Sequence, residues 1–120
     1  MKANIHDFDR LYRRTQKGVG VTGSLVRLSL NPISPNTLRV LTHVTVENKT
    51  TDFLKCRLGI TSTGRDHYLD ELTLILADEL AVSRSDILLG EKDVFFAELT
   101  GTTTGDEIVM TAIGWEQTLK

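Results

Sequence analysis

The chain has 120 residues, 40% of them hydrophobic and 25% charged, with a formal net charge of −2 at pH 7. This length and composition predict one globular domain with a core of ordinary size. No apolar run is long enough to span a bilayer, and the first residues lack the apolar region of a secretory signal, so we expect no membrane partner. The single cysteine, Cys56, excludes an intrachain disulfide and a cysteine-based zinc site, and it suits a reducing cytoplasm.

The small net charge conceals an uneven distribution along the chain. Residues 1–65 contain 11 Lys and Arg against 4 Asp and Glu, whereas residues 66–120 contain 3 against 12. Two interpretations fit this pattern. The charges belong to a solvated surface of uneven composition, or a basic part of one copy of the protein contacts an acidic part of a neighbouring copy. Nucleic-acid binding is disfavoured because the basic surface has so large an acidic counterpart.

Residues 1–18 show no strand-like alternation and are expected to form an N-terminal arm in front of a domain at residues 19–120. Apolar residues recur in this stretch at a spacing of three to four, which permits one or two helical turns, and basic residues surround them. We interpret the stretch as an arm that docks on a partner rather than as a core element. A frayed polar terminus is the other interpretation. The candidate partner-binding residues of the arm are Phe8, Arg10, Leu11, Tyr12, Arg13, Arg14 and Lys17.

Alternating apolar residues predict strands in the first half of the domain. Val26, Leu28 and Leu30 share one face of a first strand, and a loop with both prolines follows at residues 31–36. The stretch 38–60 has two alternating strands joined by a polar turn at residues 48–52. It predicts an antiparallel hairpin whose buried face carries Leu38, Val40, Val44 and Val46 from one strand and Leu54, Cys56, Leu58 and Ile60 from the other.

Residues 67–82 allow two interpretations. The leucines of this stretch lie near one face of a helix, but a strand, a break at residues 77–79 and a second strand at residues 80–82 account for the pattern equally well. The strand interpretation is preferred because the surrounding segments are all β.

The last predicted hairpin, formed by strands at residues 94–99 and 106–115, carries apolar residues on both faces. In its final strand Ile108, Met110 and Ala112 alternate with a second apolar set. A solvated face is normally polar, so the second set predicts a surface covered by a partner or by another part of the chain. Its candidate partner-binding residues are Val109, Ile113 and Trp115. Seven or eight short antiparallel strands in total predict an all-β fold, a single jelly-roll-like β-sandwich.

The sequence contains no pattern typical of a catalytic or metal site. His6, His43 and His67 are widely separated, and no nucleophile motif or phosphate-binding glycine loop is present. Glu98 lies inside an apolar strand, where burial requires a partner for its charge. The residues therefore predict a protein that is not an enzyme and holds no cofactor.

Four stretches resemble small β-sandwich virion proteins of tailed bacteriophages. These are residues 41–48, with the strand end Val46-Glu47-Asn48, residues 56–60, with the pair Leu58-Gly59, and residues 88–97 and 103–110, which contain glycine turns. The segment Gly90-Glu91-Lys92-Asp93 departs from the glycine–aspartate turn of that group. The resemblance extends over residues 25–116 and leaves the arm unexplained.

The resemblance implies a structural role on the capsid surface of a virion, after synthesis in the host cytoplasm. The protein is expected to be a cement or decoration protein that binds and stabilises the shell of the major capsid protein and also binds itself, as a dimer or trimer. A tail or neck adaptor is the alternative. A carbohydrate- or receptor-binding sandwich is less favoured because the few aromatic residues lie mostly within strands or the arm.

Overall fold

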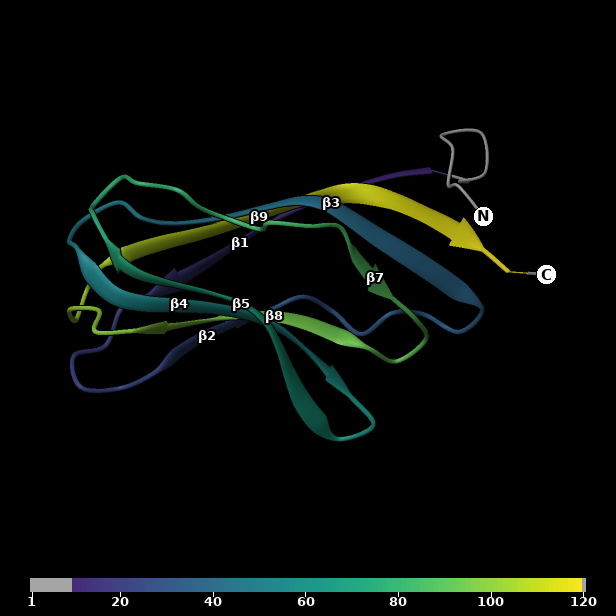
Figure 1. Ribbon diagram of the computed structural model, residues 1–120, viewed down its shortest axis with the longest axis horizontal. Helices are drawn as coiled ribbons and strands as arrows, with labels where there is room; N and C mark the ends of the chain where they lie inside the picture. Colours follow the sequence, from purple (N-terminus) through teal and green to yellow (C-terminus); the bar gives the residue numbers. More distant parts are fainter. Residues whose placement is uncertain (1–9, 120) are drawn as a thin grey trace.

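The computed structural model describes residues 10–119 and shows two antiparallel β-sheets packed face to face (Figure 1). Sheet A has the order β1-β9-β3-β6, with β7 also paired to β3; its strands are β1 (Arg10–Val19), β3 (Thr37–Asn48), β6 (Ala81–Val82), β7 (Ile87–Leu89) and β9 (Glu107–Thr118). Sheet B has the order β2-β8-β4-β5; its strands are β2 (Val26–Ser29), β4 (Phe53–Ser62), β5 (Arg65–Ile75) and β8 (Val94–Thr100). The predicted all-β sandwich is confirmed.

The chain passes from one sheet to the other at almost every connection, which is the arrangement of a jelly roll. Among the described strands, β4 and β5 are the only consecutive pair that hydrogen-bond to each other as a hairpin. The consecutive strands β6 and β7 also lie in one sheet, but each pairs with β3. The sixth position is shared by two short strands, because β6 and β7 both pair with β3. The described chain thus has nine strands in eight jelly-roll positions, close to the seven or eight expected.

The two predicted hairpins are wrong as pairings, although their strands are present. β3 pairs with β9, β6 and β7, whereas β4 pairs with β5 and β8 in the other sheet. In the same way β8 and β9 lie in opposite sheets. Alternation specifies a buried face for each strand but not the strand beside it. Between β3 and β4 the side-chain oxygen of Asn48 accepts hydrogen bonds from the backbone nitrogens of Thr50 and Thr51, which turns the chain toward sheet B.

A bulge in β3 changes which of its side chains face the core. The register with β9 shifts between Leu41 and His43, so Leu41, Val44 and Val46 are fully buried. Leu38 and Val40, which were expected on the buried face, lie only half-buried on the other side. In β4, Cys56 and Leu58 are buried as predicted, but Leu54 is 58% exposed.

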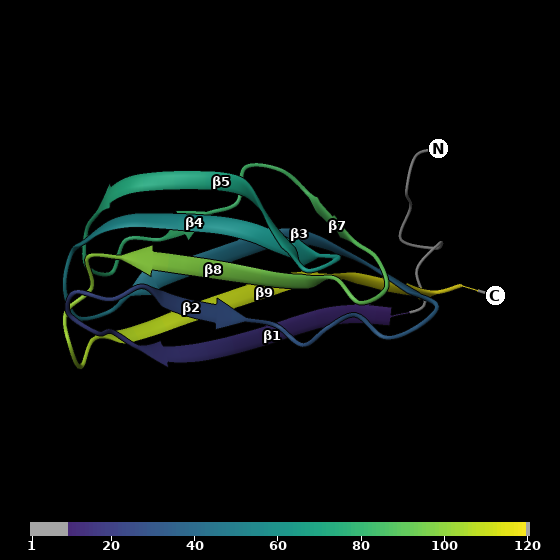
Figure 2. The ribbon, with the colours of Figure 1, turned by 90° about the horizontal axis from the view of Figure 1, so that it is seen from below.

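The structure corrects the expected N-terminal arm. Residues 10–19 form β1, a full strand of sheet A that pairs with β9 without a register shift from Arg10 opposite Glu116 to Val19 opposite Glu107. Figure 2 shows β1 along one border of the sandwich and β5 along the other. The domain therefore includes residues 10–18, and Phe8 lies outside the described residues. A strand rich in Arg and Lys has no clear apolar alternation because an edge strand needs only one half-buried side.

The ambiguous stretch at residues 67–82 is confirmed as two strands, β5 and β6, joined by a turn. Within residues 10–119 no helix is long and apolar enough to cross a membrane.

Candidate protein-binding face

The side chains that point away from the core on sheet A form the outer face of this sheet, which belongs to β1, β9, β3 and β7. The strand register places Leu11 opposite Trp115, Trp115 opposite Val40, and Val40 opposite Leu88. Because opposed residues of neighbouring antiparallel strands lie on the same side of a sheet, these four side chains make one apolar row across four strands.

The apolar row and its neighbour Ile113 remain accessible to solvent. Leu11 is 69% exposed, Leu88 63% and Ile113 38%, while Val40, Val109 and Trp115 are half-buried. The strands of residues 10–119 form two layers and provide no third layer over this face. Leu11 and Ile113 also border a hollow together with Arg13. An apolar patch on an open sheet face is typical of a surface that contacts another macromolecule.

Basic side chains border the apolar row on the β1 side. Arg13 lies opposite Ile113, and Lys17 lies opposite Val109, which in turn faces Glu47 on β3. The carboxylate of Glu47 is 3.1 Å from the Lys49 ammonium. Arg13 and Lys17 are exposed and make no ion pair within the described part of the chain. The face is therefore apolar in its middle and positive along one border.

The two sets of partner-binding residues predicted from the sequence are thus brought together in part. Leu11, Arg13 and Lys17 from the supposed arm share the outer face with Val109, Ile113 and Trp115. Arg10, Tyr12 and Arg14 lie at the alternate positions of β1, on the side toward sheet B. Sequence reasoning missed Val40 and Leu88; the three consecutive apolar residues 87–89 were a signal, since one of them has to face outward in a strand.

A buried ionic cluster fixes β1 to the rest of sheet A below this face. The Arg39 guanidinium donates to Oε2 of Glu116 from Nε at 3.1 Å and from Nη2 at 2.9 Å, and Nε of Arg10 donates to Oε1 at 3.0 Å. The Arg39 guanidinium also stacks on the ring of Tyr12, 3.7 Å from its centroid. Burial raises the pKa of Tyr12, and the nearby Arg39 charge opposes that rise only in part. The cluster orients the strand that carries Leu11 and Arg13.

The outer face of sheet B is different, because its charges are paired within the chain. Phe96 faces outward but is fully buried under the Arg27 guanidinium, which lies 4.0 Å from the ring centroid. Arg27 also pairs with Glu98, the partner that the sequence required, and donates to Asp66 at 2.7 Å. The ring of Tyr68 meets Phe96 edge-on, and hydrogen bonding with Glu98 raises the pKa of Tyr68. The cluster covers Phe96 and pairs the charges around it, so it forms no open binding site.

The described residues offer no evident catalytic chemistry. No group of three or more His, Cys, Asp or Glu side chains among residues 10–119 is placed to hold a metal ion. Burial raises the pKa of the Cys56 thiol to about 12, so this thiol is inert at neutral pH. The fold and the surface together define a jelly-roll β-sandwich with one open, apolar and basic sheet face.

No protein-family model and no curated protein matches the chain. Solved structures with a similar fold include a candidate alpha-L-fucosidase of Bacteroides thetaiotaomicron, with 5% sequence identity and a TM-score of 0.51 over 82% of this chain and 21% of that one. This chain therefore spans about a fifth of the length of that protein. Two others are the Drosophila NLP core (16% identity, TM-score 0.46, 90% and 98% of the two chains) and a family 29 carbohydrate-binding module (12% identity, TM-score 0.44, 95% and 78%). At 5% identity, the likeness to the fucosidase shows the fold alone.

Proposed function

We propose that this protein is a non-enzymatic structural protein of a tailed-phage virion. In this proposal it decorates the capsid by placing the outer face of sheet A on the major capsid protein. The observation that carries the binding role is the apolar row across four strands, which includes side chains more than 60% exposed at both ends. The resemblance to small virion proteins supports the choice of partner.

Physical chemistry favours burial of this face in a complex. Removing Leu88 and Ile113 from water stabilises a complex by roughly 25 cal/mol per Å² of apolar area, and large exposed apolar side chains on a flat surface provide such area. β9 and β3 are the longest strands of sheet A and pair over almost their whole length. They therefore present a rigid surface that loses little conformational entropy when it binds.

The motifs that carry the resemblance also have a structural role that suits a stable coat component. Asn48, at the end of the valine–x–asparagine strand, and Asp106, at the end of the Thr/Gly turn, meet in a buried hydrogen bond of 2.8 Å. Thr51 and the backbone nitrogen of Thr103 also donate to Asp106, at 2.7 Å and 2.8 Å. These contacts hold the β3–β4 and β8–β9 connections of the sandwich together.

The experiment uses particles of the phage whose genome encodes the chain, after removal of the endogenous protein. Purified wild-type protein and the variants Ile113→Asp and Leu88→Asp are incubated with these particles and sedimented. Leu69→Asp is the matched control, since Leu69 is 48% exposed on β5 in the other sheet. We expect the wild type and the control to sediment with the particles and both face variants to remain in the supernatant, while all four proteins keep their thermal transitions.

Two results contradict the proposal. Undiminished sedimentation of both face variants shows that another surface is used, and absence of wild-type binding removes the capsid role. Electron microscopy of labelled particles separates shell decoration from the neck or tail position, because label confined to one vertex identifies an adaptor.

A further inference from the structure

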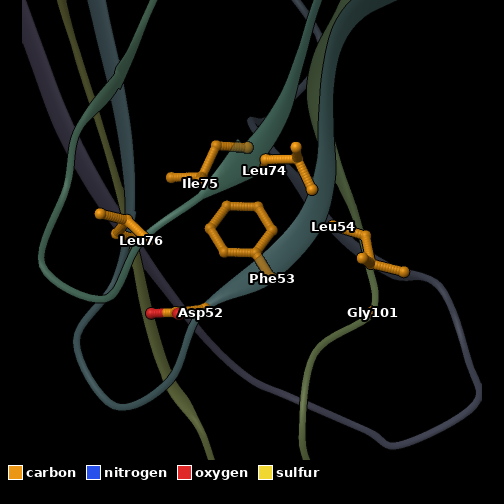
Figure 3. A pocket seen from close by; sticks show the side chains of 7 residues that line it. All are labelled: Asp52, Phe53, Leu54, Leu74, Ile75, Leu76 and Gly101. Atoms are coloured by element: carbon orange, nitrogen blue, oxygen red, sulfur yellow. The ribbon is translucent and has the colours of Figure 1, made fainter.

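A second apolar surface lies at the end of sheet B where β4 begins and β5 ends. It is a pocket of about 180 Å³, and Figure 3 shows the side chains around it. Its lining comprises Asp52, Phe53, Leu54, Leu74, Ile75 and Leu76, with Gly101 at the end of β8. We call this surface the end pocket.

The leucines of the end pocket are presented to solvent rather than packed away. Leu74 is 75% exposed, Leu54 58% and Leu76 57%. Leu74 has a φ of +55°, a left-handed conformation that is unfavourable for a residue with a side chain. At neighbouring Gly101, with a φ of +82°, an added Cβ would lie within 2.9 Å of the Leu54 side chain, so only glycine fits beside Leu54. The local backbone therefore holds an apolar patch open.

Acidic side chains surround the end pocket. Asp52 lines it, and its Oδ1 accepts a 2.8 Å hydrogen bond from the backbone nitrogen of Ala77, which holds the turn with Asp78 and Glu79 beside the leucines. All three carboxylates belong to exposed residues. Lys49, in the loop that ends at Asp52, is paired with Glu47 at 3.1 Å. The pocket is apolar with a negative border.

The first half of β1 has the complementary character. Leu11 is 69% exposed, and two exposed cations, Arg13 on the same side of the strand and Arg14 on the other, make no ion pair among the described residues. Figures 1 and 2 both place the start of β1 at the opposite end of the long axis from the beginning of β4. The longest dimension of the molecule is 46 Å, so one copy cannot bring these two surfaces into contact with each other.

We infer that the end pocket binds the β1 strand of a second copy of this chain, with Leu11 entering the pocket and the basic side chains meeting Asp52, Asp78 and Glu79. Charge excludes the symmetric alternatives. Two end pockets packed together bring carboxylates against carboxylates, and two β1 strands bring cations against cations. A contact between two different surfaces is heterologous, so it joins copies head to tail into a row or a ring.

This contact shares Leu11 with the face proposed for the capsid, but it leaves Ile113 and Leu88 on β9 and β7 exposed, so variants at those two positions test the capsid role separately. The contact also accounts for the concentration of basic residues in the first half of the sequence and of acidic residues in the second half. A row of weakly joined copies also binds a repetitive surface more strongly than one copy does, because each bound copy raises the effective concentration of the next.

Mixing two single-surface variants tests the inference by sedimentation velocity of the full-length protein. Leu11→Asp removes the side chain that enters the pocket but leaves the end pocket intact. Leu76→Asp disrupts the end pocket but leaves Leu11 intact. We expect concentration-dependent association of the wild type, monomers for each variant alone, and a 1:1 dimer with no larger species in the equimolar mixture. The control Leu69→Asp associates like the wild type.

Charge provides a second measurement that does not alter any leucine. Arg13→Glu is expected to weaken association at least about tenfold and Glu79→Lys similarly, whereas an equimolar mixture of the two regains association, because the Glu79→Lys copy keeps its basic strand and the Arg13→Glu copy keeps its acidic pocket border. Raising the salt concentration from about 50 mM to about 500 mM weakens wild-type association, because exposed charges are screened.

A wild type that stays monomeric, a mixture that stays monomeric, or single variants that still associate each overturn the inference. Particle sedimentation of Ile113→Asp is a separate readout, so failure of one idea is distinguishable from failure of the other.

Discussion

Asn48 donates a 2.8 Å hydrogen bond from Nδ2 to Oδ2 of Asp106, a residue 58 positions later in the chain. Both side chains are fully or almost fully buried, and Asp106 is only 1% exposed. Burial alone raises the pKa of Asp106, but the hydrogen bonds from Asn48, the Thr103 backbone and Thr51 together outweigh it and lower the pKa below its usual range.

Asp106→Asn is therefore expected to lower the free energy of unfolding by about 1–3 kcal/mol at pH 7, because an amide nitrogen replaces an oxygen that accepts hydrogen bonds. A folded pKa below the unfolded value of about 3.9 means that the stabilisation is complete above that pH and is lost as the pH falls through the folded pKa. The free energy of unfolding in urea, measured from about pH 2 to about pH 7, reports both effects. Asp86→Asn, at an exposed position, is the control; equal acid sensitivity of Asp106→Asn and the wild type contradicts the prediction.

Gly114 allows β9 to approach β3 beside the bulge at Leu41. A Cβ at this position would overlap the carbonyl oxygen of Val40 and lie 2.9 Å from Cα of Leu41. Since both obstacles are backbone atoms, Gly114→Ala is expected to cost at least about 3 kcal/mol or to prevent folding. In Gly90→Ala the nearest atom is a side-chain oxygen of Asp93 at 3.7 Å, so this control is expected to be nearly neutral. Similar unfolding midpoints for the two variants refute this account of Gly114.

The Arg39–Glu116 pair predicts strong coupling in a double-mutant cycle. Both residues are 8% exposed, so Glu116→Leu leaves a buried cation without its carboxylate and is expected to cost about 3–5 kcal/mol. Replacing both residues, as Arg39→Met with Glu116→Leu, is expected to cost less than either single change, because no buried charge is left unpaired and Arg10, whose side chain is 60% exposed, stays in contact with water. Urea unfolding of the wild type, the two single variants and the double variant gives the coupling energy, and additive free energies would falsify the prediction.

The position of β1 predicts the effect of shortening the chain. A chain that begins at Arg10 keeps all the β1–β9 pairs, whereas a chain that begins at residue 20 loses ten paired residues and exposes the edge of β9. We expect the first to give a cooperative transition and the second to be strongly destabilised or to aggregate through the bare edge. Circular dichroism melting and light scattering measure both properties. A cooperative, monomeric fold in the shorter chain shows that β1 is an appendage after all.

The Cys56 thiol predicts slow labelling of the folded protein. With its pKa raised to about 12 by burial, almost none is thiolate at pH 8, whereas an unfolded cysteine has a pKa of about 8.5. A thiol reagent is expected to react only as fast as the protein opens, and rapidly in urea. In a Cys56→Ala background, Leu88→Cys places a thiol at a position that is 63% exposed in the wild type and is expected to react at once. Equal rates for the two folded proteins contradict the burial of Cys56.

Particular strands show why pairing was harder to predict than strand position. The alternation of β3, β4, β8 and β9 located each of them, and it placed Met110 and Ala112 in the core as observed. It also assigned Val109, Ile113 and Trp115 to the opposite side. Neither hairpin was paired as predicted, because partners in a jelly roll are distant along the chain. The β1 residues were placed in an arm because a half-exposed edge strand has little hydrophobic periodicity.

The amino-acid sequence by itself determined the all-β class, the main strands, the buried Cys56 and the presence of a second apolar side on the last strand, because each depends on local alternation and turn residues. Only the tertiary structure decided that Leu11, Trp115, Val40 and Leu88 form one row, that Arg39 lies between Tyr12 and Glu116, and that the end pocket and the start of β1 lie at opposite ends. These relationships depend on strand order, on the bulge after Leu41 and on the crossing of the chain between sheets, which are set by contacts between residues far apart in the sequence.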